Sequence, residues 1–201
     1  MKTRESGMPD EAMWRTFFDA EAILTALGLT GETGDAADFG CGYGTFAIPA
    51  ARRIRGTLHG FDIEPAMIAE CERLASLAEL HNVHVERRDF VAAGTGLADQ
   101  SVDYAMLFNL LHAEAPLRLL REALRILAPG GLVAVIHWNH DPATPRGPSM
   151  AIRPRPEDCR RWLAEAGFVL VGETIPLPPY HYGLLGQKGT AHETRHDHHP
   201  D

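Results

Sequence analysis

The sequence predicts an α/β fold in which strands and helices alternate around a mostly parallel sheet. Short runs of apolar residues recur as candidate strands at residues 35–39, 57–61, 83–88, 102–108 and 132–137. Helical patterns lie between several of these runs, at residues 45–55, 65–80 and 117–127. Strands that alternate with helices at this spacing are joined by crossover connections, which make the strands parallel and cover both faces of the sheet.

The C-terminal part predicts a different connection. The stretch 139–156 carries five prolines and is expected to be a long ordered loop, followed by a helix at 157–166. Two further strand-like runs, 169–175 and 180–186, are joined by only four residues. This joint is too short for a crossover helix, so the last two strands must be antiparallel neighbours. The sheet is therefore expected to have seven strands.

The first 33 residues predict one amphipathic helix. Apolar side chains recur at roughly helical spacing from Trp14 through Phe17, Phe18 and Leu24 to Leu27, and Gly28 ends the pattern. If crossover helices occupy both faces of the sheet, the apolar stripe of this helix needs another partner. We therefore expect it to cover the cleft at the carboxyl ends of the strands.

Composition excludes several classes of function. The 201 residues suffice for one buried core, and 19 basic against 27 acidic residues give a net charge of −8, which opposes nucleic-acid binding. The only lysines, Lys2 and Lys188, are near the chain ends, which disfavours a catalytic lysine. Three cysteines cannot form a disulfide framework, so a reducing cytoplasmic setting is expected. The sequence predicts neither a signal peptide nor a membrane span.

A glycine turn and a later acid indicate a bound nucleoside. Asp38-Phe39-Gly40-Cys41-Gly42-Tyr43-Gly44 follows the first strand, and Asp62 ends the second, 22 positions after Gly40. A carboxylate there can accept hydrogen bonds from both hydroxyls of an adenosine ribose. The spacing is not Gly-x-Gly-x-x-Gly, and Asp38 would repel a pyrophosphate, so a cofactor with an ammonium group fits better. A tight turn without a ligand is the alternative.

Four motifs in order now resemble a known family. They are residues 38–44, the run Gly60-Phe61-Asp62-Ile63-Glu64-Pro65-Ala66-Met67, Arg88-Asp89-Phe90, and Leu127-Ala128-Pro129-Gly130-Gly131. Together they resemble the class I S-adenosylmethionine-dependent methyltransferases, in the type 11-like branch. The resemblance covers roughly residues 34–188 and implies a Rossmann-like, doubly wound seven-stranded sheet with an antiparallel C-terminal strand pair. It implies S-adenosyl-L-methionine as cofactor and S-adenosyl-L-homocysteine as product.

The resemblance also implies which residues contact the cofactor: Asp38, Gly40, Gly42, Gly44, Asp62, Ile63, Asp89, Phe90 and Asn109. Within that set it places Asp38 and the glycine turn at the methionine end and Asp62 at the ribose. It places Ile63 on the adenine ring, Asp89 at the adenine amino group and the Phe90 amide at the adjacent ring nitrogen. Asn109 would line the pocket shared with the acceptor.

Methyl transfer needs alignment and, for some acceptors, a base. His112, in the loop after the fourth strand, is the best-placed catalytic candidate, with His137 among the alternatives; a pocket-lining histidine that carries no proton is an equal interpretation. The proline-rich loop contains three arginines, Arg146, Arg153 and Arg155, which are candidates for binding an anionic acceptor. The alternative is that their side chains are solvated.

These patterns predict a three-part organisation. Residues 1–33 form the helical cover, 34–188 the methyltransferase domain, and 189–201 a disordered histidine-rich tail. Nothing fixes the geometry of the tail histidines, so no metal site is expected. With one helix and one long loop beyond the core, the acceptor should be a small molecule; no membrane partner is expected, and the oligomeric state is left open. The rival functions are a nicotinamide-dependent oxidoreductase and a cofactor-binding subunit without catalysis.

Overall fold

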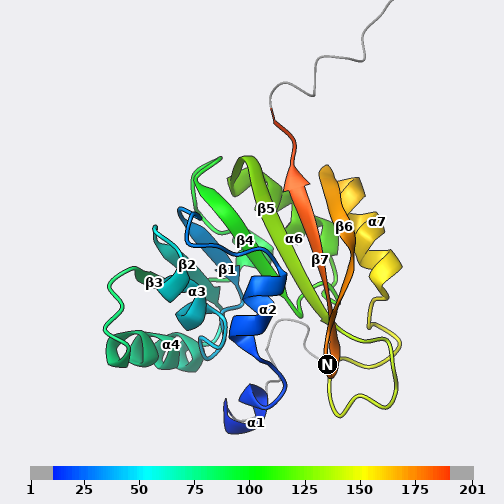
Figure 1. The fold of residues 1–201 in the computed structure, drawn as a ribbon, viewed down its shortest axis with the longest axis horizontal. Helices are drawn as coiled ribbons and strands as arrows, with labels where there is room; N and C mark the ends of the chain where they lie inside the picture. The colour runs from blue at the N-terminus through cyan, green and yellow to red at the C-terminus, as the bar shows by residue number, and fades with distance from the viewer. Residues whose placement is uncertain (1–10, 191–201) are drawn as a thin grey trace, which may run out of the picture.

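Seven strands form one mixed sheet in the order β3-β2-β1-β4-β5-β7-β6 in the computed structural model, which describes residues 11–190 (Figure 1). The strands are β1 (Ala36–Phe39), β2 (Leu58–Asp62), β3 (Val83–Arg87), β4 (Val102–Phe108), β5 (Leu127–Trp138), β6 (Phe168–Leu177) and β7 (His181–Lys188). Strands β1 to β5 are parallel, and β7 is antiparallel to both β5 and β6. The predicted fold class is confirmed.

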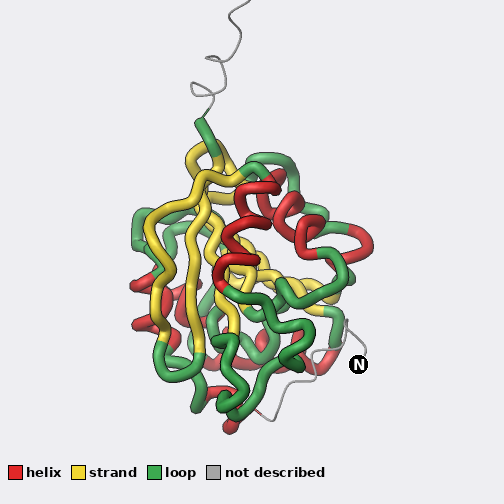
Figure 2. The backbone as a smooth tube through the Cα atoms, turned by 90° about the vertical axis from the view of Figure 1, so that its right-hand side faces the viewer, coloured by secondary structure: helices red, strands yellow, loops and turns green. Residues whose placement is uncertain are grey.

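Helices lie on both sides of the sheet, and the loops gather at one end of it (Figure 2). The helices are α1 (Glu11–Arg15), α2 (Ala20–Ala26), α3 (Ala47–Arg53), α4 (Pro65–Leu77), α5 (Phe90–Ala93), α6 (Pro116–Ile126) and α7 (Pro156–Ala166). A proline in the first turn starts α4, α6 and α7, where its missing N–H has no intrahelical partner to lose. Gly167, at φ 104°, ends α7 in the left-handed conformation.

Successive residues of the strands contribute alternately to two separate hydrophobic clusters. Ala36, Tyr104 and Met106 face the side covered by α2, α3 and α4. Their neighbours Ala37 and Ala105 face the side covered by α5, α6 and α7. This alternation is the period of two that a sheet buried on both faces requires.

The N-terminal segment differs from the single helix predicted for it. The chain leaves helical conformation after α1 and starts again at α2, where the Asp19 carboxylate accepts a hydrogen bond from the Ala22 N–H at 3.0 Å. An aspartate placed in this way caps a helix start better than it continues a helix. Two short helices, α1 and α2, therefore stand where one was predicted, and residues 16–19 separate them.

Helix α2 packs on the sheet rather than over its end. Leu24 and Leu27 are fully buried in the cluster of Ala36, and the Tyr104 hydroxyl donates to the Leu27 carbonyl at 2.8 Å. The expectation that crossover helices fill both faces was wrong, because the hairpin between β6 and β7 supplies no helix. The face over β4, β5 and β7 is left open on the α3 side, and α2 fills it.

The burial of α2 predicts a large effect for a single core substitution. Leu24→Ala should lower the free energy of unfolding by about 2–4 kcal/mol, because it removes buried methyl groups and leaves a cavity. Leu77→Ala makes the same change on α4, where the leucine is 70% exposed, and should cost less than about 0.5 kcal/mol. Urea unfolding of both variants measures the difference, and equal values would contradict the placement of α2 in the core.

Candidate cofactor and acceptor site

The glycine turn is fastened to the end of β2 by backbone hydrogen bonds. The N–H groups of Gly40 and Cys41 both donate to the Phe61 carbonyl, at 2.7 and 3.0 Å. The next glycine continues the pattern, since the Gly42 N–H donates to Oδ2 of Asp62 at 3.0 Å. The carboxyl ends of β1 and β2 are thereby locked together around one acidic side chain.

Two of the glycines in the turn allow close packing. Gly40 and Gly44 have φ angles of 74° and 81°, which side chains rarely adopt. A Cβ on Gly40 would lie 3.2 Å from Leu110, in the loop after β4, and one on Gly44 would lie 3.0 Å from the Sγ of Cys71 in α4. The turn therefore sits tightly between the β4 loop and α4.

Asp38 and Asp62 form a buried acidic pair at this turn. Their exposed fractions are 3% and 5%. Burial, together with the nearby Asp62 carboxylate, raises the pKa of Asp38 to about 7. Burial also raises the pKa of Asp62, although the N–H groups of Glu64 and Gly42 stabilise its charged form. A cation placed here would relieve the repulsion between the two carboxylates.

The other predicted adenine contacts lie after β2 and β3, at the same end of the sheet. Ile63 is half-buried directly after β2. Asp89 precedes α5 and caps it, because its carboxylate accepts from the Ala92 N–H at 3.0 Å. Phe90 begins α5, with its ring packed edge-on against Phe39 at 5.5 Å between centroids. The structure thus gives Asp89 and Phe90 roles within the fold, and their contacts with the cofactor stay a prediction.

Asn109, directly after β4, carries buried polar atoms without partners. Its backbone has a φ of 58°, and its N–H donates to the Ile136 carbonyl at 2.8 Å, which fixes the residue. Within residues 11–190, neither the nitrogen nor the oxygen of its side-chain amide finds a hydrogen-bond partner, and the same holds for the Thr45 hydroxyl. Leaving such groups unpaired is costly, so these atoms indicate a polar ligand.

Two histidines meet beside this position. Nδ1 of His112, in the loop after β4, lies 3.2 Å from Nε2 of His137 in β5. Burial lowers the pKa of His112, and it lowers the pKa of the fully buried His137 further. Both rings are therefore neutral near pH 7, as a proton acceptor must be.

An aromatic cluster, formed by Phe17, Phe18, Trp138, Tyr180 and His181, adjoins the ends of β5 and β7. Ring centroids are 5.4 Å apart for Phe17 and Trp138, 4.5 Å for Phe18 and His181, and 4.2 Å for Trp138 and His181. The residues between α1 and α2 thus lie at the functional edge. The sequence interpretation missed His181, although a strand antiparallel to β5 must begin where β5 ends.

Arg153 is not available to an anionic acceptor. Its side chain is buried, and its guanidinium donates to the carbonyls of Pro148, Asn139, Asp141 and Arg146 and to the Thr144 hydroxyl. It therefore holds together the loop between β5 and α7. Arg155 stands at the N-terminal cap of α7, and Arg146 is exposed near the sulfur of Met13.

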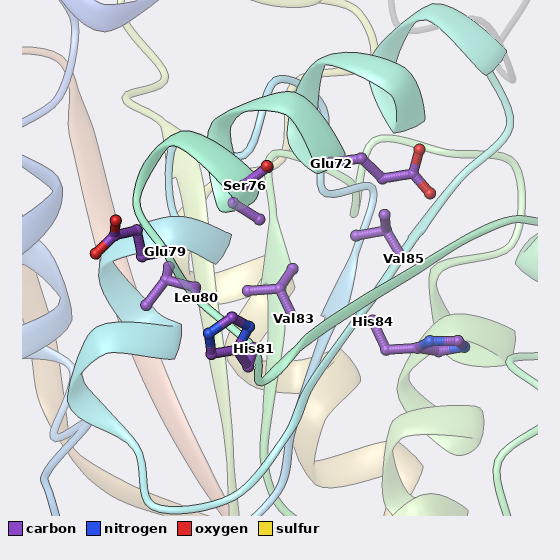
Figure 3. Close-up of a pocket in the computed structure, with 9 residues that line it drawn as sticks. Glu72, Ser76, Glu79, Leu80, His81, Val83, His84 and Val85 are labelled. Atoms are coloured by element: carbon purple, nitrogen blue, oxygen red, sulfur yellow. The ribbon is translucent and has the colours of Figure 1, made fainter.

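A groove of about 600 Å³ lies elsewhere, between the C-terminal part of α4 and the edge strand β3 (Figure 3). Glu72, Ser76, Glu79, His81 and His84 are among its lining residues, and none of the predicted cofactor contacts is among them. In the part of the chain that is described, no group of three or more His, Cys, Asp and Glu side chains is arranged to hold a metal ion. No helix between residues 11 and 190 is long and apolar enough to cross a membrane.

Comparisons with known proteins agree with this geometry. Residues 36–131 match the family model described as a methyltransferase domain. Aklanonic acid methyltransferase DauC of Streptomyces sp. (strain C5) is 32% identical over 109 residues, which is 53% of this chain and 48% of DauC. The match therefore spans about half the length of that relative.

Solved structures share the fold. A SAM-dependent methyltransferase from Aquifex aeolicus superposes with a TM-score of 0.77 at 22% identity, over 89% of this chain and 93% of that one. The [4+2]-cyclase SpnF does so with a TM-score of 0.72 at 20% identity, over 86% and 80% of the chains. The chain has the Rossmann-like fold of the class I S-adenosylmethionine-dependent methyltransferases, and the matched methyltransferase domain model confirms the resemblance seen in the sequence. S-adenosylmethionine is the cofactor that this family and fold imply.

The buried acidic pair predicts an unusual pH dependence of stability. The pKa of Asp38 is about 7 in the folded protein, above its value in the unfolded chain, so the folded state holds the extra proton between about pH 4 and 7. Stability should therefore fall as the pH rises through this window. Asp38→Asn should remove this loss, so the stability of the cofactor-free variant relative to wild type should increase by about 1–3 kcal/mol between pH 5 and pH 8. Urea unfolding at the two pH values provides the measurement, and parallel curves would refute it.

Proposed function

We propose that this protein transfers a methyl group from S-adenosylmethionine to a small-molecule acceptor. The observation that carries the proposal is the buried pair of Asp38 and Asp62 at the glycine turn, because it provides a site for a cationic, hydroxyl-bearing ligand. The unpartnered amide of Asn109, directly after β4, supports the same location.

Each part of the cofactor has residues that suit it. Asp38 would face the ammonium group of the methionine end, beside the turn formed by Gly40, Gly42 and Gly44. Asp62 would accept from the ribose hydroxyls through the lone pairs that its two backbone hydrogen bonds leave free. Ile63, Asp89 and Phe90 would surround the adenine. When bound, S-adenosylmethionine supplies a methyl group on a sulfonium, whose leaving group needs no further activation.

The glycine turn is poorly suited to bind the pyrophosphate of a dinucleotide. A pyrophosphate site uses free backbone N–H groups at the start of a helix. Here the N–H groups of Gly40, Cys41 and Gly42 already donate to Phe61 and Asp62. The acidic pair would also repel the phosphates, so nicotinamide-dependent chemistry is disfavoured.

The acceptor side favours a small, apolar or aromatic molecule. Two rings of the aromatic cluster, those of Phe18 and Tyr180, are partly exposed and would provide apolar contacts for such a molecule. The relative DauC is named for a small-molecule acceptor, aklanonic acid. We further propose that residues 11–19 cover this side and that residues 20–29 belong to the core of the domain formed with residues 34–188. We also propose a reducing, cytoplasmic setting, which is supported by the buried, free thiols of Cys41, Cys71 and Cys159.

The ribose contact gives the first test of this function. Asp62→Ala should weaken S-adenosylmethionine binding by ~10²-fold or more, because it removes charge-assisted hydrogen bonds to two hydroxyls. Asp103→Ala is the matched control, since Asp103 likewise accepts a glycine N–H, from Gly34 at 2.9 Å, but lies near the start of β4. Calorimetry on both variants, with NAD as a second ligand, decides the matter. Tight NAD binding with no heat from S-adenosylmethionine would overturn the proposal.

The role of His112 gives the second test. His112→Ala should lower kcat by ~10²–10⁴-fold for a hydroxyl or thiol acceptor, with little change in cofactor affinity, because the variant lacks the base. Since burial lowers the pKa of His112, the wild-type rate should fall only below about pH 6.5, where the imidazole becomes protonated. Product release with a panel of acceptors measures both effects. A variant that keeps most of the wild-type turnover with such an acceptor would contradict the prediction and leave His112 as a pocket-lining residue.

A further inference from the structure

We propose that His137 is a positioning residue for His112: its Nε2 accepts a hydrogen bond from Nδ1–H of His112 and leaves Nε2 of His112 free to take a proton. This inference rests on the proposed methyl transfer to a hydroxyl or thiol acceptor. The two rings meet edge to face at an interplanar angle of 81°, with Nδ1 of His112 3.2 Å from Nε2 of His137.

The two histidines differ in how firmly they are held. His137 is fully buried near the end of β5, where its backbone pairs with Tyr182 of β7. His112 lies in a turn between β4 and α6, and a hydrogen bond from the Ala113 N–H to the Leu110 carbonyl at 3.0 Å closes this turn. A ring anchored in the sheet therefore orients a ring on a loop, which is how a base is aligned by a third group in other nucleophile–base arrangements.

The geometry brings one nitrogen of each ring together. One nitrogen of a neutral imidazole donates and the other accepts. Nε2 of His137 faces Nδ1 of His112, so one of these two atoms donates and the other accepts. We assign the proton to Nδ1 of His112, because this tautomer leaves Nε2 of His112 free to be the base that the proposed function requires.

The environment of His137 keeps its ring uncharged. Burial disfavours a positive charge on this ring most strongly, and His112, His181 of β7 and Arg153 of the 139–156 loop disfavour it further. The ring centroid of Tyr182 lies 6.3 Å from that of His137. The Tyr182 hydroxyl is hydrogen-bonded to the Pro154 carbonyl and to the Sγ of Cys159 in α7. His137 is therefore a neutral acceptor and does not take over the proton.

The reaction balances with these roles. The acceptor gives its proton to Nε2 of His112, while its electron pair forms the bond to the methyl carbon. The bond between that carbon and the sulfonium breaks, and its electron pair goes to sulfur. His112 is then an imidazolium, and its hydrogen bond to His137 becomes charge-assisted and stronger.

The tautomer can be read without any turnover. Two-bond ¹⁵N–¹H correlation spectra of the ¹⁵N-labelled, cofactor-free wild-type protein report which nitrogen of each ring is protonated. We expect a protonated Nδ1 and a bare Nε2 on His112 at pH 7.5. A protonated Nε2 on His112 would overturn the proposal, whatever the protein turns out to methylate.

Variants at position 137 test the consequence. His137→Phe keeps a ring but removes the acceptor, so it should lower the titration midpoint of His112 and reduce kcat ~10- to 100-fold, with the KM for S-adenosylmethionine unchanged. His137→Gln restores an acceptor atom, so the titration midpoint of His112 and kcat should both return most of the way to the wild-type values. His84→Phe, on the exposed edge of β3, is the matched control and should behave as wild type.

An equal decrease of kcat in the Phe and Gln variants would overturn the proposal and indicate that His137 has a packing role alone. If His137→Phe fails to fold, the wild-type spectrum and the Gln variant still decide. If no acceptor is ever methylated, the proposed function fails, and the tautomer of His112 independently shows whether the histidine pair is arranged as described.

Discussion

The hydrogen bonds between the glycine turn and the end of β2 are the constraint on which the rest of the site depends. Three consecutive N–H groups, those of Gly40, Cys41 and Gly42, are satisfied by the Phe61 carbonyl and the Asp62 carboxylate. In a dinucleotide site, such groups would be left for phosphate. Because they are used internally here and Asp38 and Asp62 are both acidic, the turn suits the ligand that we propose, one with a cationic end and hydroxyl groups.

This arrangement is unfavourable for the empty protein. Two carboxyl groups are buried side by side, and the Asn109 amide and the Thr45 hydroxyl lack hydrogen bonds within residues 11–190. A chain selected for stability alone would replace such groups by apolar ones. In the function that we propose, a ligand completes their hydrogen bonds and balances the charge, which would couple binding to stability at this turn.

The sequence predicted the features that depend on local signals. Strand β1 contains Ala36 and Ala37, which have little intrinsic preference for a strand, yet the glycine turn after it and the acid at the end of β2 located it correctly. The short joint before β7 likewise required an antiparallel pair. The glycine turn and Asp62 were brought together as expected, because consecutive parallel strands end at the same edge of a sheet.

Features that depend on the whole topology were not predictable in this way. The position of α2 follows from a face that the β6–β7 hairpin leaves open, and no residue within 20–26 signals this. Arginine is a residue type that often binds anions, but in this fold the Arg153 guanidinium donates its hydrogen bonds to backbone carbonyls of its own loop. The break before α2 was readable in principle, since Asp19 is a good helix cap.

The reversed strand β7 contributes to the aromatic cluster and not to the glycine turn. Parallel strands bring only their carboxyl ends to the functional edge, and these ends carry the candidate cofactor residues. Because β7 runs the other way, it brings its beginning to this edge, where His181 pairs with Trp138 and its ring packs against that of Phe18. The acceptor side that we propose is therefore assembled from three segments that are far apart in sequence. On this proposal, a change in any one of these segments would alter the choice of acceptor while the glycine turn, held by β1 and β2, stays as it is.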